Sequence, residues 1–151
     1  MNIVNDLMSA EIDQLATALA KAQAEMAVAG KNQKNPFFKS SYADFQAIIQ
    51  ASRPALSKYG LSVVQPPFIY EEAADSTNTA VGSSYLVTIL MHSSGQWIKS
   101  KARHNPLKSD IQSLSSYNTY LKRMCYTSLV GVVTGDDDDG EAAVAHTRPN
   151  V

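Results

Sequence analysis

The spacing of apolar residues predicts a long amphipathic helix near the N-terminus, from about residue 9 to residue 29. Apolar side chains recur there every three or four positions, as on one face of a helix. Ser9 is expected to cap this helix and Gly30 to end it. The residues that form the predicted stripe are Ile12, Leu15, Leu19, Ala22 and Met26.

A second helix is predicted from about residue 44 to residue 59, and Gly60 is its expected stop. Pro54 lies inside this segment, where its ring removes a backbone donor and clashes with the preceding turn. We therefore expect a kink near Ser52, or a break into two short helices.

Three strands are predicted next, since runs rich in β-branched and aromatic residues alternate with turn residues. The first covers residues 61–66 and is expected to resume at 68–70 after two prolines. A polar, acidic loop is predicted over residues 71–82. The second strand covers 84–92, and Gly95 marks a hairpin turn that leads into the third, residues 97–103.

A last helix is predicted from Asp110 to Val132. Its apolar sector contains Asn118, a polar group that needs a partner. The opposite sector carries hydroxyls, phenols and two cations without any acid, namely Ser116, Thr119, Tyr120, Lys122, Arg123, Tyr126 and Thr127. The residues expected to pack into the core are Ile111, Leu114, Tyr117, Leu121, Cys125 and Leu129. The pattern predicts an α+β fold in which a three-stranded antiparallel sheet packs with flanking helices.

Composition indicates one globular domain with a separate C-terminal tail. The chain has 151 residues, of which 44% are hydrophobic and 18% charged, a balance typical of folded proteins. We expect a domain over residues 1–134 and a disordered acidic tail over 135–151. No apolar run approaches the roughly 20 residues needed to cross a bilayer. Because the N-terminus has no signal-peptide pattern, a cytoplasmic protein is expected.

The net charge of −1 hides a separation of acids and bases. Residues 136–141 contain five acids and no base, whereas residues 99–123 contain six bases and a single acid, Asp110. One interpretation is a nucleic-acid-binding surface beside an acidic tail. The other is a solvated face with a solubilising tail.

Two segments carry candidate nucleic-acid-binding residues. Because side chains alternate along a strand, Trp97 and three cations, Lys99, Lys101 and Arg103, are expected to share one face. Residues 31–42 contain three lysines and no acid. Aromatic side chains beside lysines suit base stacking.

Several catalytic signatures are absent from the sequence. No Gly-rich phosphate loop, dinucleotide fingerprint or nucleophile motif occurs. The histidines, at positions 92, 104 and 146, lack metal-ligand spacing, and the single cysteine excludes a disulfide. We therefore predict no catalytic residue, no metal site and no cofactor. A Mg²⁺-dependent nuclease that uses Asp110 and the run Asp136–Asp139 remains an alternative.

Five strings follow one another along the chain: NPFFKSSYADFQAII (35–49), RPALSKYGL (53–61), HSSGQWI (92–98), QSLSS (112–116), and Thr119-Tyr120 with Lys122-Arg123. Gly131-Val132 and Asp137-Asp138-Asp139-Gly140 come after them. In this order the strings resemble the ERF superfamily of phage single-strand annealing proteins, and the resemblance covers about residues 10–141. The chain departs from the family pattern at Ser115, at Tyr117-Asn118 and at Met124.

The resemblance implies a Rad52-like β-β-β-α core, assembly into rings or helical filaments, and pairing of complementary single strands without ATP. Leu121-Lys122-Arg123 is similar to a family stretch that lines a DNA groove. Expected partners are single-stranded DNA and further copies of the chain, with a phage exonuclease or a host single-strand binding protein as a further partner, all in the bacterial cytoplasm.

We expect one basic groove between the third strand and the last helix to hold a DNA strand. The predicted DNA-binding residues are Lys39, Tyr42, Lys99, Lys101, Arg103, Tyr120, Lys122 and Arg123. A non-catalytic scaffold that binds anions unspecifically is a third interpretation.

Overall fold

The computed structural model describes residues 7–31, 33–34, 41–66, 69–74 and 80–135. Its helices are α2 (Asp13–Glu25), α3 (Phe45–Lys58) and α4 (Ile111–Val130). Its strands are β1 (Gln33–Lys34), β2 (Ser41–Tyr42), β3 (Leu61–Val64), β4 (Ile69–Ala74), β5 (Ala80–His92) and β6 (Trp97–His104).

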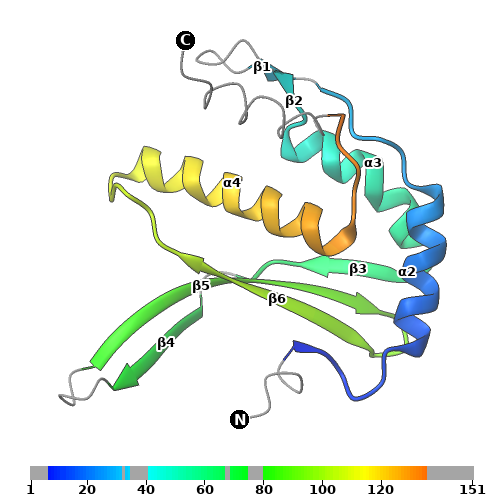
Figure 1. Cartoon of the computed structure of the whole chain (residues 1–151), viewed down its shortest axis with the longest axis horizontal. Helices are drawn as coiled ribbons and strands as arrows, with labels where there is room; N and C mark the ends of the chain where they lie inside the picture. The colour runs from blue at the N-terminus through cyan, green and yellow to red at the C-terminus, as the bar shows by residue number, and fades with distance from the viewer. Residues whose placement is uncertain (1–6, 32, 35–40, 67–68, 75–79, 136–151) are drawn as a thin grey trace, which may run out of the picture.

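β5 is the centre of an antiparallel sheet (Figure 1). β6 runs along one edge of β5, and β3 and β4 share the other edge one after the other. The strand predicted to resume after the prolines is therefore confirmed. The predicted loop over 71–82 is wrong in part, because β4 and the start of β5 pair there from Ile69↔Tyr85 to Ala74↔Ala80. Residues 75–79 lie outside the described part.

The helices α3 and α4 lie on one side of the sheet, which gives the predicted α+β architecture (Figure 1). The core between the layers is apolar, and Leu15, Ile48, Leu90 and Val130 are at most 2% exposed. A satellite cluster joins Leu86 to Leu121 and Cys125 of α4. Burial of apolar side chains therefore holds the helices to the sheet.

The caps of α4 explain its limits. Asp110 accepts a hydrogen bond from the backbone N–H of Ser113 at 2.9 Å, and so satisfies a donor of the first turn. Gly131 ends the helix with φ 77°, in the left-handed region that favours glycine. The hairpin turn uses Gly95 in the same way, with φ 89°.

Two predictions about helix boundaries are wrong. Ser9 does not cap α2; its Oγ accepts from the backbone N–H of Trp97 at 3.0 Å, which ties the N-terminal segment to β6. α2 accordingly begins only at Asp13 and ends at Glu25, before Gly30. The segment after it pairs with the chain that follows α4, through a parallel bridge between Ala29 and Thr134.

Of the two alternatives predicted at Pro54, the break into two short helices does not occur, because α3 is one helix. The helix continues through Pro54 because the proline and the carbonyl it leaves without a donor, that of Gln50, belong to exposed residues. Ala55 and Leu56, directly after the proline, are buried in the core and hold the last turn in place.

Two positions of α4 differ from the predicted pattern, and a third agrees with it. Tyr126, assigned to the polar sector, is only 4% exposed and its hydroxyl lies 2.9 Å from the Oγ of Ser52. Ile111, assigned to the core, is 87% exposed because it is the first residue of the helix. Asn118 has the partner it needed, since its Oδ1 lies 2.8 Å from the Nε2 of His104.

Candidate nucleic-acid interface

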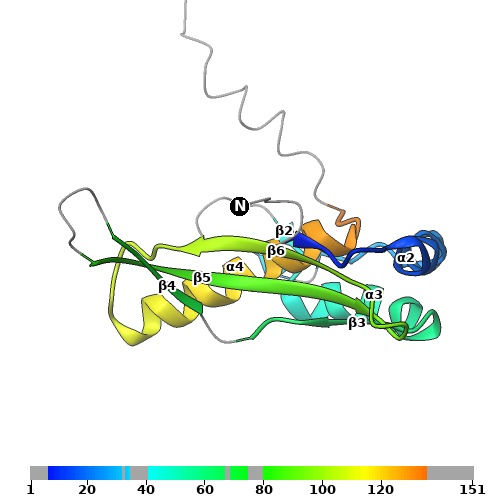
Figure 2. The same ribbon diagram turned by 90° about the horizontal axis from the view of Figure 1, so that it is seen from below.

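The three predicted cations of β6 share one face of the sheet. In the register of the β5–β6 pair, Lys99 lies opposite Ile89, Lys101 opposite Val87 and Arg103 opposite Tyr85. The residues between them point the other way: Ile98 and Ala102 pack against the two apolar clusters under the helices. Because side chains alternate across a strand, the cations lie on the open face, over which no described helix passes (Figure 2).

Aromatic rings of the same face lie beneath the two lysine ammonium groups. The Nζ of Lys99 is 5.2 Å from the ring centroid of Trp97, and the Nζ of Lys101 is 4.5 Å from that of Tyr85. Such cation–π contacts are worth about 0.5–1 kcal/mol at exposed sites. They hold the long side chains along the sheet. We call this face of Tyr85, Trp97, Lys99, Lys101 and Arg103 the strand surface.

Tyr85 is a component that the sequence reasoning missed. The signal was present, because the short turn that ends at Gln96 fixes the register of the hairpin. Counting back from that turn places Tyr85 opposite Arg103, as the structure has it.

A second group of predicted residues meets around Arg123 of α4. Its guanidinium carbon is 4.8 Å from the ring centroid of Tyr42 on β2 and 5.5 Å from that of Tyr120 on α4. Tyr120 is 54% exposed. Lys122 is half-buried, and its backbone carbonyl accepts a hydrogen bond from the side-chain amide of Gln65 at 3.0 Å. We call Tyr42, Tyr120, Lys122 and Arg123 the helix surface.

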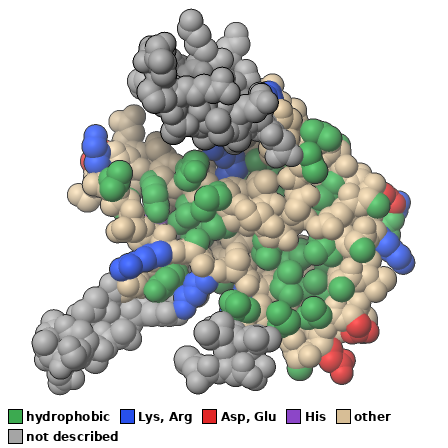
Figure 3. Space-filling view, in the orientation of Figure 1, with side chains coloured by type: hydrophobic (Ala, Val, Ile, Leu, Met, Phe, Trp, Pro, Cys, Tyr) green, Lys and Arg blue, Asp and Glu red, His purple; other side chains and the backbone are tan. Residues whose placement is uncertain are grey.

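The predicted groove between β6 and α4 does not form within one chain. α4 packs on the face of β6 that contains Ala102, and the cations of β6 lie on the other face. The strand surface and the helix surface are therefore on opposite sides of the sheet. Figure 3 shows Lys and Arg side chains at several separate places on one side of the molecule instead of in one patch. Lys39, the remaining predicted residue, lies outside the described residues.

The acid proposed for metal-dependent chemistry has a structural role. Hydrogen bonds from Ser113 hold the pKa of the Asp110 carboxyl below its usual value, as is usual for a carboxylate that caps a helix. Within the described part of the chain, no group of three or more His, Cys, Asp or Glu side chains could hold a metal ion. Asp136–Asp139 lie outside that part.

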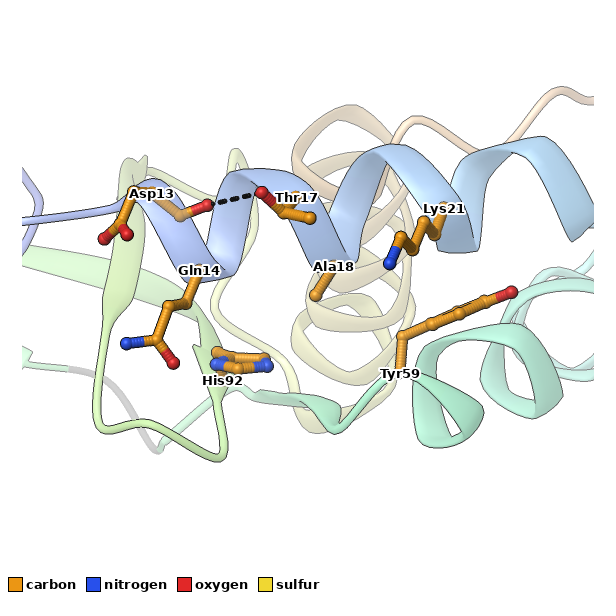
Figure 4. Close-up of a pocket in the computed structure, with 7 residues that line it drawn as sticks. All are labelled: Asp13, Gln14, Thr17, Ala18, Lys21, Tyr59 and His92. Carbon is orange, nitrogen blue, oxygen red and sulfur yellow. Dashed lines mark hydrogen bonds between the residues drawn. The ribbon is translucent and has the colours of Figure 1, made fainter.

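A pocket of about 320 Å³ lies between α2 and the end of β5 (Figure 4). Its lining combines one acid, Asp13, with one base, Lys21, and the phenol ring of Tyr59. Asp13 is already engaged, since it accepts a hydrogen bond from the side chain of Gln96 at 2.7 Å. None of the predicted DNA-binding residues lines this pocket.

Together these features define a class: an α+β domain that has helices on one side of its sheet and cations with aromatic rings on both sides. Comparison with known proteins identifies the family. The family model described as the ERF superfamily matches residues 15–150, and the chain belongs to this superfamily. No curated protein and no solved structure gives a significant match, so the Rad52-like fold stays a prediction.

The family match also bears on the extent of the domain. It runs through residue 150 and so includes the acidic segment. The division at residue 134 stays a prediction. No helix in the described ranges is long and apolar enough to span a bilayer.

Proposed function

We propose that this chain is a non-catalytic, ATP-independent protein that binds and anneals single-stranded DNA in phage-type homologous recombination. Membership of the ERF superfamily supports the proposal. The proposed setting is the cytoplasm of a bacterial host, where a phage exonuclease or a host single-strand binding protein is the proposed further partner.

The strand surface is the observation that carries the proposal. Cations at alternate positions of a strand are about 6.6 Å apart, at roughly 3.3 Å per residue. Lys101 and Arg103 are exposed and Lys99 is half-buried, so the row faces solvent along the sheet. Like charges in such a row repel each other, and the phosphates of an extended strand relieve that repulsion.

The helix surface suits the stacking of bases, which is the second component of single-strand binding beside contacts to the phosphates. The exposed ring of Tyr120 and the ring of Tyr42 flank a planar guanidinium, and each base stacked on an aromatic side chain contributes about 1–3 kcal/mol. Lys122 and Arg123 add charge for the sugar-phosphate backbone. Lys39 belongs to the same proposed set by its place in the sequence.

The separation of the two surfaces supports a multi-copy assembly. A single chain cannot enclose one DNA strand between surfaces on opposite sides of its sheet. A continuous track therefore has to pass from one copy to the next, as in a ring or a helical filament. In this arrangement a bound strand exposes its bases, and a second strand tests them by pairing.

The experiment is annealing of complementary oligonucleotides without ATP and with a chelator, followed by fluorescence quenching. Wild type should accelerate pairing. Lys99→Ala/Lys101→Ala/Arg103→Ala and Lys122→Ala/Arg123→Ala should each lose most of the acceleration. The matched control is Lys21→Ala/Lys108→Ala, which removes exposed cations from outside both surfaces and should keep it.

Salt dependence gives a second measurement. For single strands, log affinity falls with log salt at about −0.7 per neutralised phosphate. The triple variant of the strand surface should therefore flatten the slope by about 2. Cleavage of the strands that requires Mg²⁺ would support a nuclease instead, and binding without faster pairing would support a scaffold.

A further inference from the structure

The described part of the chain ends at Gly135, next to Ala29 and Lys31. The backbone N–H of Gly135 donates a hydrogen bond to the carbonyl of Ala29 at 3.4 Å. The backbone N–H of Ala29 donates to the carbonyl of Val133 at 2.9 Å. A Cβ built on Gly135 would be 3.6 Å from the Cε of Lys31. The position from which residue 136 continues is therefore fixed, next to Lys31.

A short path leads from this position to Arg123. Lys31 precedes Gln33 by two residues, and Gln33 pairs with Tyr42 across the β1–β2 ladder. The ring of Tyr42 in turn covers the guanidinium of Arg123 at 4.8 Å. Neighbouring strands are about 4.8 Å apart and a strand rises roughly 3.3 Å per residue, so the whole path is on the order of 15–20 Å.

The charges along this path and at its far end are complementary to those of residues 136–141. Residues 136–141, Asp-Asp-Asp-Asp-Gly-Glu, contain five acids, and residues 31–42 contain three lysines and no acid. The solvent-facing sector of α4 around Tyr120 and Arg123 also has no acid. Six extended residues span at most about 20 Å, which is enough to bring these carboxylates to the helix surface.

We propose that the acidic segment 136–141 docks on the helix surface of its own chain and competes there with the phosphates of single-stranded DNA. The competition rests on the proposed function, whereas the docking does not. A segment attached beside its target is present at an effective concentration in the millimolar range or above. Electrostatic docking of this kind weakens DNA binding most at low salt, because salt screens both interactions.

The docking is tested without DNA, by carbodiimide coupling and mass spectrometry. The reagent activates a carboxylate, the lysine amine attacks the activated carbon, and a urea leaves as the amide bond forms. We expect coupling of residues 136–141 to Lys122 at low salt, and its loss at 0.5 M salt. Lys108, an exposed lysine of the loop before α4, is the internal control and should not couple.

Each outcome of the coupling experiment decides for or against the docking. Any result without coupling to Lys122 would overturn the proposal, including coupling to Lys31 alone, because Lys31 adjoins the start of the segment and reacts by proximity. An equimolar mixture of isotopically heavy and light chains distinguishes coupling within one chain from coupling between two chains. Mixed heavy–light products would overturn docking within one chain, and unmixed products would support it.

The competition is tested with an oligothymidine at low salt. The variant Asp136→Asn/Asp137→Asn/Asp138→Asn/Asp139→Asn should bind about tenfold more tightly than wild type, and the matching Asp→Glu variant should bind like wild type. The gain should vanish when Lys122→Ala/Arg123→Ala is added.

A gain that persists in that combined variant would indicate a general effect of net charge and would overturn competition at this site. If no variant binds DNA but Lys122 couples to the segment, the docking stands and the proposed function fails.

Discussion

The two faces of β5 differ in their surroundings: one is covered by the helices and the other lies beside the cations of β6. On the covered face, Leu86, Thr88 and Leu90 are almost fully buried under the helices. On the open face, Tyr85 and Ile89 are half-buried and lie beside the cations of β6, whereas Val87 between them is buried. Successive residues of one strand thus face the core under the helices and the cations of β6 in turn. Substitutions on the covered face should change the free energy of unfolding, and those on the open face should change affinity for a polyanion.

The largest expected effect is on the covered face. Leu90→Ala removes a side chain that is 0% exposed, and should lower the free energy of unfolding by about 2–5 kcal/mol through lost burial and the cavity left behind. Ile89→Ala, its neighbour on the open face, should cost less than half as much. Urea denaturation followed by circular dichroism measures both. Equal losses would contradict the difference between the faces.

A hydrogen bond on the covered face gives a smaller effect. The Oγ1 of Thr88 accepts from the side-chain amide of Gln65 at 3.0 Å, and the same amide donates to the carbonyl of Lys122. Thr88→Val keeps the shape but removes the acceptor. It should lower the free energy of unfolding by about 1 kcal/mol. Thr88→Ser, which keeps a hydroxyl, separates loss of the hydrogen bond from loss of the methyl group.

A substitution on the open face should change the affinity for DNA more than the free energy of unfolding. Lys101→Met keeps an aliphatic chain over Tyr85 but removes the ammonium. The free energy of unfolding should change by less than about 1 kcal/mol, the usual range for an exposed cation–π contact. The slope of log affinity against log salt should flatten by about 0.7. A large loss of stability with an unchanged slope would assign Lys101 to the fold instead.

The smallest expected effect on stability is at an exposed ion pair between α2 and the end of α3. Lys58 donates to both carboxylate oxygens of Glu25, at 2.8 and 2.7 Å, and the hydroxyl of Tyr59 donates to the same carboxylate. These hydrogen bonds, the one from Lys58 first, lower the pKa of Glu25 from its usual 4.5.

A lowered pKa makes the pair stabilising above pH 4.5, and this stability is lost as the pH falls through the pKa of the folded protein. Glu25→Gln should therefore reduce the acid-induced drop in melting temperature slightly, with Glu11→Gln as a control. A steeper drop in the variant would contradict the assignment.

Much of the fold followed from local patterns, because these reflect physics within a few residues. The hairpin around Gly95, the helix α4 and the resumed edge strand are set by turn geometry, the spacing of apolar residues and β-propensity. The failures came from distant contacts. Ser9 was expected to cap a helix but bonds to Trp97, and Tyr126 was placed on a wet face because its partner, Ser52, belongs to another helix.

The sequence predicted which residues of the candidate site share a face of β6, but not on which side of the sheet α4 packs. Alternation correctly placed Lys99, Lys101 and Arg103 on one face. Which face α4 would cover depends on whether it packs on Ala102 or on the lysines, and small side chains such as Ala102 allow a helix to approach. The sequence contained that preference, but the groove hypothesis did not use it.

The bridge between Ala29 and Thr134 joins the two ends of the domain, because it pairs the segment after α2 with the segment after α4. A shortened chain that stops before Gly135 would lose one of the two backbone hydrogen bonds of this bridge, the one from Gly135 to Ala29. A truncation meant to remove only the acidic residues should therefore keep Gly135, or its effects on DNA and on folding would be confounded.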